Sequence, residues 1–182
     1  MPAAGAEMRN PNGRKGVEAL QDRSAPNAPL DAIDRRILRR LQEDSLIANQ
    51  KLADEVGLSP PACLKRVRRL RAAGVIRGTV ALLDAPALGY PVLTVVRVKL
   101  DRPRDKAMRE FERRMAEAPR VAFCLTVAGD IDYVLLVRSR DVADYQDFAR
   151  QILATAPGIR AYTSEIVLEV PKWTTAIPLP EA

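Results

Sequence analysis

The sequence contains no histidine among its 182 residues, and this absence bears directly on catalysis. Histidine is the commonest general acid–base group and a frequent metal ligand near neutral pH. The sequence also shows no cysteine cluster at metal-binding spacing, no nucleophile paired with a base and no phosphate-binding loop. We therefore expect a protein that is not an enzyme and that holds no metal and no cofactor.

Cysteine occurs only twice, at Cys63 and Cys124, in regions that we expect to belong to different domains. This spacing argues against a disulfide and predicts two buried free thiols in a reducing compartment. The sequence contains no run of 18 apolar residues, the length needed to span a membrane. The N-terminus also lacks the apolar core of a secretion signal. These absences predict a cytoplasmic protein without membrane association.

The net charge of +6 is unevenly distributed along the chain. Residues 30–78 hold eleven Lys or Arg against six Asp or Glu, whereas residues 79–182 hold fourteen of each. An excess of positive charge on one part is the electrostatic footprint of nucleic-acid binding. Residues 1–29 are rich in Gly, Pro, Ala and Asn, and we expect them to form a flexible tail.

Residues 49–74, with the sequence NQKLADEVGLSPPACLKRVRRLRAAG, predict two short helices that meet at a tight turn. The small Ala53 lies four residues before Gly57, which permits close helix crossing and a turn that would strain a residue with a Cβ atom. Ser59 is placed to cap the second helix, and two prolines fit its first turn. A supporting helix from Leu30, capped by Asp31, completes a (winged) helix-turn-helix domain over residues 30–78.

The second helix places Cys63, Val67 and Leu70 on one apolar face. Its other faces carry Lys65, Arg66, Arg68, Arg69 and Arg71. A charged helix face is often only solvated surface, but here it coincides with the turn and the capped second helix. The combination favours a recognition helix that enters the major groove of double-stranded DNA.

Residues near the start of a recognition helix reach base edges, and longer cations further along reach phosphates. The predicted DNA contacts are Ser59, Pro61, Ala62, Lys65, Arg66 and Arg69. Arg66 or Lys65 could pair with guanine O6 and N7. For Arg66 the alternative is a salt bridge within the domain, for Arg71 it is simple solvation, and Cys63 is a core residue rather than a contact.

The C-terminal part, residues 90–182, alternates strands and helices in the order βαββαβ, which predicts an α+β, ferredoxin-like antiparallel sheet with both helices on one face. The expected elements are strand 91–100, helix 104–118, strands 121–127 and 132–138, helix 141–154 and strand 159–170. Residues 79–89 are the expected linker, with a short strand over Thr79–Leu83 followed by a turn-rich segment.

The predicted strands are apolar on both faces, although one face of such a sheet should be polar. In strand 121–127, for example, Val121, Phe123 and Leu125 are expected to oppose Ala122 and Cys124. An exposed apolar sheet face is an association surface. The sequence thus predicts a homodimer with packed sheets, whose two recognition helices would match a pseudo-palindromic DNA site.

Four segments together resemble the Lrp/AsnC family of bacterial and archaeal transcriptional regulators. These segments are LDAIDRRILRRLQED, LADEVGLSPPACLKRVRRLRAAGVIRG, VAGDIDYVLLV and VPKWTTAIPL, and the resemblance covers about residues 30–180. It implies an N-terminal DNA-binding domain and a C-terminal domain that oligomerises and senses small molecules, commonly amino acids, with dimers that can assemble into octamers. Departures at Leu46, Thr79 and Pro60-Pro61 concern the DNA sequence read rather than the fold.

The resemblance also implies an effector pocket at a subunit interface, built from the glycine-centred loop between the middle strands. The predicted effector-binding residues are Thr126, Gly129, Asp130, Asp132 and Tyr133. Gly129 permits close backbone approach to a ligand, and the carboxylates could accept hydrogen bonds from an α-ammonium group. The alternative is an ordinary β-turn in which aspartate suits the turn geometry.

Two other functions fit this architecture. One is a DNA-wrapping protein that acts without a ligand, which the charge and the fold permit. The other is a sirohaem decarboxylase, because such enzymes resemble these regulators. Those enzymes rely on histidines, which this sequence lacks, so a transcriptional regulator responsive to an amino acid is the favoured function.

Overall fold

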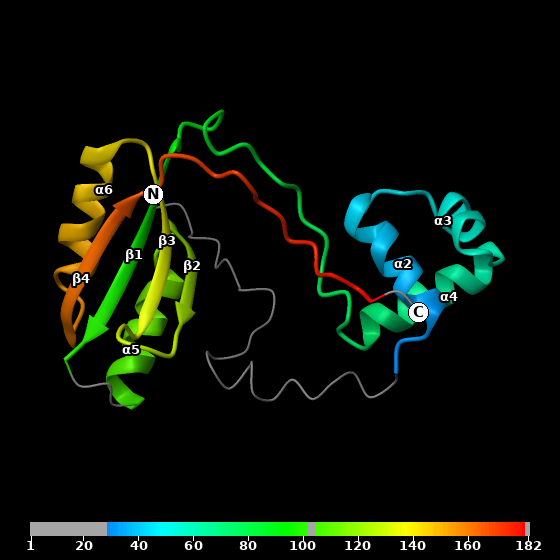
Figure 1. The fold of residues 1–182 in the computed structure, drawn as a ribbon, viewed down its shortest axis with the longest axis horizontal. Helices are drawn as coiled ribbons and strands as arrows, with labels where there is room; N and C mark the ends of the chain where they lie inside the picture. The colour runs from blue at the N-terminus through cyan, green and yellow to red at the C-terminus, as the bar shows by residue number, and fades with distance from the viewer. Residues whose placement is uncertain (1–28, 102–104, 181–182) are drawn as a thin grey trace, which may run out of the picture. The chain divides into compact units, whose positions relative to one another are not determined.

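The computed structural model describes residues 29–101 and 105–180, which form two compact units (Figure 1). One unit consists of residues 83–170, and the other holds the three helices of the N-terminal half together with residues 171–180. The predicted flexible tail, apart from Pro29, lies outside the described residues.

The helical unit contains α2 (Ala32–Glu43), α3 (Asn49–Val56) and α4 (Pro60–Ala72). Asp31 caps α2 in a reciprocal capping box with Asp34, as the sequence predicts. One apolar core joins the three helices, and its buried members are Ile37, Leu38, Leu52, Ala53, Val56, Cys63, Val67 and Leu70. The predicted helix-turn-helix is therefore confirmed, with the apolar face of α4 turned inward.

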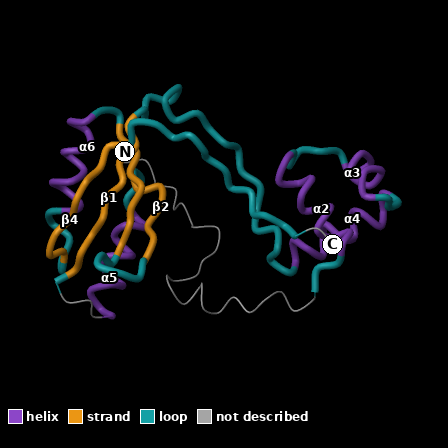
Figure 2. Tube along the Cα trace, in the orientation of Figure 1, coloured by secondary structure: helices purple, strands orange, loops and turns teal. Residues whose placement is uncertain are grey.

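The segment that follows α4 differs from the prediction. Thr79–Leu83 is not a strand, and neither a wing strand nor a linker strand occurs in the described chain between α4 and residue 91 (Figure 2). A strand exists only where a neighbouring strand completes its hydrogen bonds, and none of the four described strands pairs with this segment. Its apolar side chains stay in solvent, with Val80 77% and Leu82 76% exposed.

The second unit is a four-stranded antiparallel sheet with helices on one face, which confirms the predicted βαββαβ fold. Its elements are β1 (Val92–Leu100), α5 (Asp105–Glu117), β2 (Val121–Thr126), β3 (Tyr133–Ser139), α6 (Val142–Phe148), the π-helical turn η1 (Ala149–Leu153) and β4 (Ile159–Ile166). The strands lie in the order β2-β3-β1-β4. The last predicted strand is shorter than expected, because pairing with β1 ends at Ile166.

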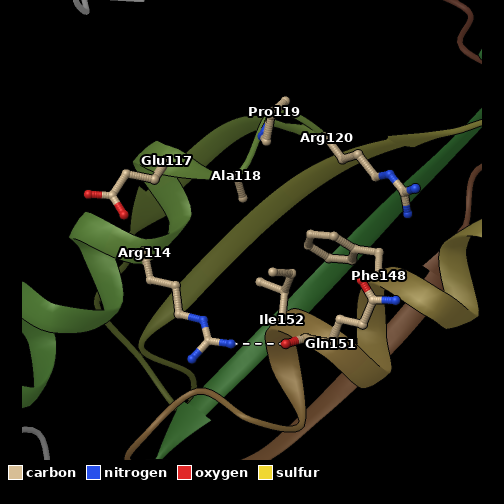
Figure 3. Close-up of a pocket in the computed structure, with 8 residues that line it drawn as sticks. All are labelled: Arg114, Glu117, Ala118, Pro119, Arg120, Phe148, Gln151 and Ile152. Carbon is tan, nitrogen blue, oxygen red and sulfur yellow. Dashed lines mark hydrogen bonds between the residues drawn. The ribbon is translucent and has the colours of Figure 1, made fainter. Parts of the chain in front are cut away.

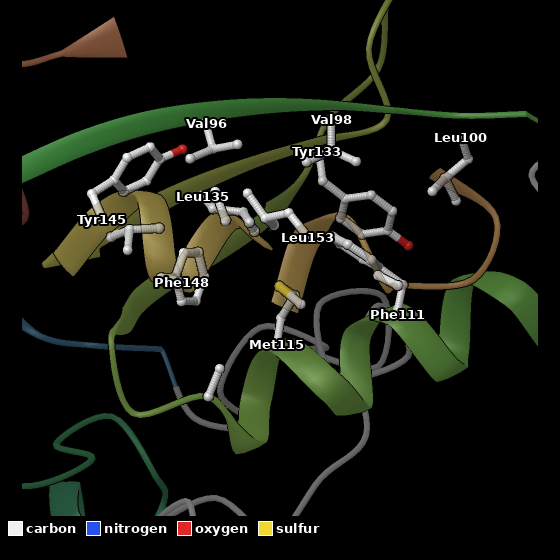
Figure 4. Close-up of a cluster of buried hydrophobic side chains, with 14 residues drawn as sticks. Val96, Val98, Leu100, Phe111, Met115, Tyr133, Leu135, Tyr145, Phe148 and Leu153 are labelled. Carbon is white, nitrogen blue, oxygen red and sulfur yellow. The ribbon is translucent and has the colours of Figure 1, made fainter. Parts of the chain in front are cut away.

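The core of this unit lies between the sheet and the helices (Figure 4). Val96 and Val98 of β1 and Leu135 of β3 face Phe111 of α5 and Phe148 of α6. Cys124 packs at the edge of this cluster, and burial raises the pKa of its thiol to about 12. Both cysteines are free, as the sequence predicts.

The opposite face of the sheet carries apolar cross-strand rows. Phe123 pairs with Leu136, which in turn pairs with Val95, and Leu125 pairs with Val134 in the next row. Phe123 and Leu125 are 46% and 47% exposed, so part of this apolar surface is open to solvent. The structure thus confirms that both faces of the sheet are apolar.

The outer face of the sheet becomes charged toward β4, where Arg97 of β1 forms an ion pair with Glu165 of β4 at 3.2 Å. The predicted side of the sheet is wrong for Val121. This residue packs against the core on the helix side and not on the outer face with Phe123. The register of β2 against β3 shifts between these two residues. Such a bulge places two residues opposite one and reverses the alternation beyond it.

The chain that follows β4 returns to the helical unit. Residues 171–180 group with the helical unit, where Gln42 and Arg39 of α2 hold their backbone. Leu179 packs against the helical core. Extended segments give little periodic signal in a sequence, so this packing is not readable from residue spacing.

Candidate nucleic-acid interface and effector loop

The turn between α3 and α4 is held in one geometry by backbone and side-chain hydrogen bonds. Gly57 ends α3 with φ +71°, a left-handed conformation that favours glycine. The amide of Leu58 donates to the carbonyl of Ala53 at 2.9 Å. The side-chain Nδ2 of Asn49 donates to the carbonyl of Pro60 at 2.9 Å, which ties the start of α3 to the start of α4.

The start of α4 offers few amide donors to an anion. Ser59 occupies the capping position, but its side chain makes no capping hydrogen bond. Pro60 and Pro61 occupy the first two helical positions and carry no N–H groups, so Ala62 supplies the first backbone donor of the helix. This end of the helix therefore provides one hydroxyl and one amide, both near Pro61.

The solvent face of α4 lies opposite its buried residues Cys63 and Val67. Pro61, Lys65 and Arg68 follow at i, i+4 and i+7, and all three are exposed. Lys65 and Arg68 thus project two positive charges away from the helical core. This arrangement presents cations to a polyanion with little reorganisation.

Arg66 and Arg69, predicted as DNA contacts, point instead toward α2. Arg66 Nη1 lies 2.6 Å from Asp31 Oδ2 and 3.0 Å from Asp34 Oδ1, and Arg69 Nη2 pairs with Asp34 Oδ2. The Asp34 side chain is fully buried, and these two guanidinium groups form ion pairs with it. The alternative considered for Arg66, a salt bridge within the domain, is the arrangement present in the structure.

The same network shifts the acidity of its exposed members. The Asp34 backbone amide and the Arg66 guanidinium lower the pKa of Asp31, and hydrogen bonds to Asp31 and Asp34 raise the pKa of Arg66. A second ion pair, Arg40 Nε to Glu55 Oε2 at 2.5 Å, joins α2 to α3. Ion pairs from α2 therefore hold both helices of the helix-turn-helix.

Arg68 is an exposed cation of α4 that the predicted DNA contacts omit. Its place could have been found by excluding the positions that face the acidic side chains of α2. Such an exclusion requires knowing that Asp34 pairs with Arg69, and the two residues lie 35 positions apart in the sequence. Leu64, 37% exposed, adds an apolar surface beside the cations.

The predicted effector loop joins β2 to β3, and its ends are firmly fixed. The amide of Val127 donates to the carbonyl of Asp132 at 3.0 Å. Asp132 also accepts a hydrogen bond from the amide of Leu100 through Oδ2 at 2.7 Å. Asp132 therefore ties the loop to the end of β1. This structural role agrees with the alternative that the loop is an ordinary β-turn.

The tip of the loop is open to solvent. Gly129 has φ +142°, within the region that strains other residues, and a Cβ atom there would meet nothing within 4 Å. Asp130 of the loop and Thr126, the last residue of β2, are also exposed. All three predicted residues are thus accessible to solvent.

Tyr133 is buried rather than exposed at the loop. Its ring centroid lies 4.7 Å from that of Phe111, and its hydroxyl donates to Glu112 Oε1 at 3.0 Å. Burial, followed by the neighbouring Glu112 carboxylate, raises the pKa of Tyr133 above its ordinary value. Its position supports the loop from within the core.

A separate shallow cavity of about 350 Å³ lies between the end of α5 and the α6–η1 helices (Figure 3). Arg114 donates to the carbonyls of Gln151 at 2.9 Å and Thr155 at 3.1 Å, and Arg120 pairs with Asp144 at 2.7 Å. These arginines connect the helices around the cavity. None of the predicted effector residues lines it.

Neither a metal site nor a membrane span is found in residues 29–101 and 105–180. Within these ranges no three His, Cys, Asp or Glu side chains gather closely enough to bind a metal ion. No helix in the same part of the chain is both long and apolar enough to cross a membrane.

Comparisons with known proteins cover both units. Residues 30–77 match a winged helix-turn-helix DNA-binding model, and residues 93–177 match the Lrp/AsnC ligand binding domain. A leucine-responsive regulatory protein of Rhizobium meliloti is 43% identical over 130 residues, covering 71% of this chain and 83% of that protein. The corresponding protein of Haemophilus influenzae is 38% identical, covering 84% of this chain and 92% of that protein.

Solved structures of regulatory proteins also resemble most of this chain. A transcriptional regulator of Neisseria meningitidis in complex with L-Met superposes with a TM-score of 0.79 at 31% identity, covering 82% of this chain and 97% of that chain. A feast or famine regulatory protein of M. tuberculosis, also complexed with L-methionine, gives a TM-score of 0.74 at 32% identity, covering 84% of this chain and 100% of that chain.

A helix-turn-helix unit followed by an α+β ligand-binding unit defines a DNA-binding transcriptional regulator rather than an enzyme. The chain belongs to the Lrp/AsnC family of such regulators. The family resemblance seen in the sequence is therefore confirmed.

Proposed function

We propose that this regulator reads a specific DNA site with the solvent face of α4, and that an amino acid bound at the β2–β3 loop controls its assembly on DNA. The observation that carries the DNA part is the exposed pair Lys65 and Arg68, which stands opposite the buried face of a braced helix. Lys65 and Arg68 contact phosphates, while Ser59, Pro61 and Ala62 lie nearest the base edges.

In this proposal Arg66 and Arg69 act indirectly. Their ion pairs with Asp31 and Asp34 fix the orientation of α4 relative to α2. A guanidinium already held by a buried carboxylate would give up that contact to reach a base, so these residues position the helix rather than read DNA. The predicted guanine contact of Arg66 is therefore not part of this proposal, and Lys65 keeps its phosphate contact.

The effector is proposed to be an amino acid, because two relatives of known structure are complexed with L-methionine and others are named leucine-responsive. Thr126, Gly129 and Asp130 form its accessible contact surface, and the Asp130 carboxylate pairs with the α-ammonium group. Asp132 and Tyr133 hold the loop in shape from behind.

Asp130→Ala is expected to weaken binding of L-methionine, or of whichever common amino acid binds, by at least about tenfold. A charge-assisted hydrogen bond contributes about 1.5–3 kcal/mol, which corresponds to that loss. Asp147→Ala, which removes an exposed carboxylate on α6, is the control and should leave binding unchanged. Calorimetric titration of the purified protein measures both, and no heat with any common amino acid would contradict the proposal.

Assembly is proposed to occur through the outer face of the sheet, where Phe123 and Leu136 continue one apolar row and Leu125 and Val134 the next. A twofold dimer would present two α4 helices to a pseudo-palindromic site, and dimers can associate further into an octamer. Since the protein is proposed to act on DNA, its proposed location is the cytoplasm.

Effector binding would favour one assembly over another and so change how many recognition helices engage DNA together. Mapping genomic binding with and without candidate amino acids tests this mechanism. Short protected sites whose occupancy changes with the amino acid are the expected result. Long phased protection that ignores every amino acid would favour the ligand-independent DNA-wrapping function instead.

A further inference from the structure

The C-terminal segment is bound by α2 as though it were a peptide ligand. The side-chain amide of Gln42 makes two hydrogen bonds with one residue of the segment. Its Nε2 donates to the carbonyl of Ile177 at 3.1 Å, and its Oε1 accepts from the amide of Ile177 at 2.6 Å. Arg39 Nη2 donates to the carbonyl of Pro180 at 3.0 Å. Three backbone groups of this short segment therefore have side-chain partners on one helix.

The sequence of the segment suits this mode of binding. Residues 177–180 read Ile-Pro-Leu-Pro, and proline restricts the backbone to extended conformations, which lowers the entropy lost on docking. Leu179 lies between the two prolines and packs against the helical core. The segment thus combines backbone hydrogen bonds with one apolar anchor, as proline-rich ligands do.

The helical unit is small enough to need such an addition. Residues 30–78 comprise fewer than 60 residues, a size at which a folded domain buries only about 60% of its unfolded surface. Leu179 extends the core of this unit from a distant part of the chain. Docking of the segment and folding of the DNA-binding unit should therefore stabilise each other.

The docked segment also provides a second covalent connection between the two units. The first connection runs from Ile76, the last residue packed on the helical core after α4, to Val92 at the start of β1. Fully extended, its sixteen residue steps span about 53–58 Å. The second runs from Ile166 at the end of β4 to Ile177, and its eleven steps span at most about 36–40 Å.

We propose that residues 176–180 form a strap that docks on α2 of the same chain and limits how far the DNA-binding unit can move from the sheet unit. When docked, the shorter connection sets the maximum separation. When released, the longer linker sets it, and the recognition helix samples a larger volume. The strap connects β4 of the ligand-binding unit directly to α2, the helix whose ion pairs hold α4.

Hydrogen–deuterium exchange of the full-length protein tests the docking. Gln42→Ala and Leu179→Asp should each raise the exchange rate of residues 176–180 at least about threefold. Gln42→Ala removes the two backbone contacts without touching the core, so it remains informative if Leu179→Asp unfolds the helical unit. Leu168→Asp and Gln50→Ala are the matched controls, because Leu168 is 96% exposed on the connection between β4 and the strap, and Gln50 donates to Asp54 within α3.

Exchange at residues 176–180 that is equally fast in the unaltered protein, the two variants and the two controls would overturn the strap. Protection that disappears when the protein is diluted would also overturn it, because the segment would then come from a second copy. Small-angle X-ray scattering should show a larger maximum dimension for Gln42→Ala than for Gln50→Ala, and equal dimensions would refute the restraint. None of these measurements requires DNA or effector, so the strap can fail without the proposed function failing.

Discussion

Asp34→Ala is expected to unfold the helical unit and abolish DNA binding while the sheet unit stays folded. The substitution removes a fully buried carboxylate that pairs with both Arg66 and Arg69 and completes the capping box of α2. Breaking a buried ion pair costs about 3–5 kcal/mol. Since Arg66 and Arg69 are partly exposed and can regain water, we expect the lower end of that range.

A loss of about 3 kcal/mol is a large fraction of the stability of so small a domain. Differential scanning calorimetry should show an early transition for Asp34→Ala and a second transition, from the sheet unit, that is unchanged. Asp54→Ala is the control, because Asp54 is an exposed carboxylate that accepts a hydrogen bond from Gln50 of the same helix. Equal melting behaviour of Asp34→Ala and Asp54→Ala would show that the buried ion pairs contribute nothing.

Leu125→Glu is expected to dissociate the proposed dimer. Leu125 lies on the edge strand β2, in the open apolar rows, opposite Val134 and two residues from Phe123. A twofold interface contains every substitution twice, so two unpaired carboxylates would be buried at once. We expect the dissociation constant to rise at least about 100-fold, because each buried, unpaired charge costs several kcal/mol.

Sedimentation velocity at micromolar concentration measures this change directly. Val142→Glu is a matched control, because Val142 is 46% exposed, against 47% for Leu125, but lies on α6 rather than on the strands. The unaltered protein and Val142→Glu should sediment as the same oligomer, and Leu125→Glu as a monomer. A monomeric unaltered protein would remove the proposal that the outer sheet face mediates assembly.

The fold could be predicted from the sequence because its signals are local. Apolar residues at helical spacing, such as Cys63, Val67 and Leu70, identify the buried face of α4 without knowledge of its neighbours. Gly57 and Asp31 mark a helix end and a helix start through backbone requirements that hold in any fold. The alternating strands likewise place the βαββαβ order correctly.

The details that the sequence did not reveal depend on residues far apart in the chain. Arg66 and Arg69 look like DNA contacts until Asp34, more than 30 residues earlier, is placed beside them. The extended residues 79–83 resemble a strand in composition, but no described strand pairs with them. The docking of Leu179 and the bulge after Val121 likewise arise from packing, which single-sequence periodicity does not encode.

The adjacent residues Arg68 and Arg69 allow the most direct test of the central claim that the outer face of α4 contacts DNA. The salt dependence of duplex binding, followed by fluorescence anisotropy, reports the number of phosphate contacts. Arg68→Ala should reduce the salt slope by about one and leave the melting temperature unchanged. Arg69→Ala should instead lower the melting temperature and leave the salt slope intact, because its partner is Asp34. A reduced slope for Arg69→Ala, with none for Arg68→Ala, would contradict the account.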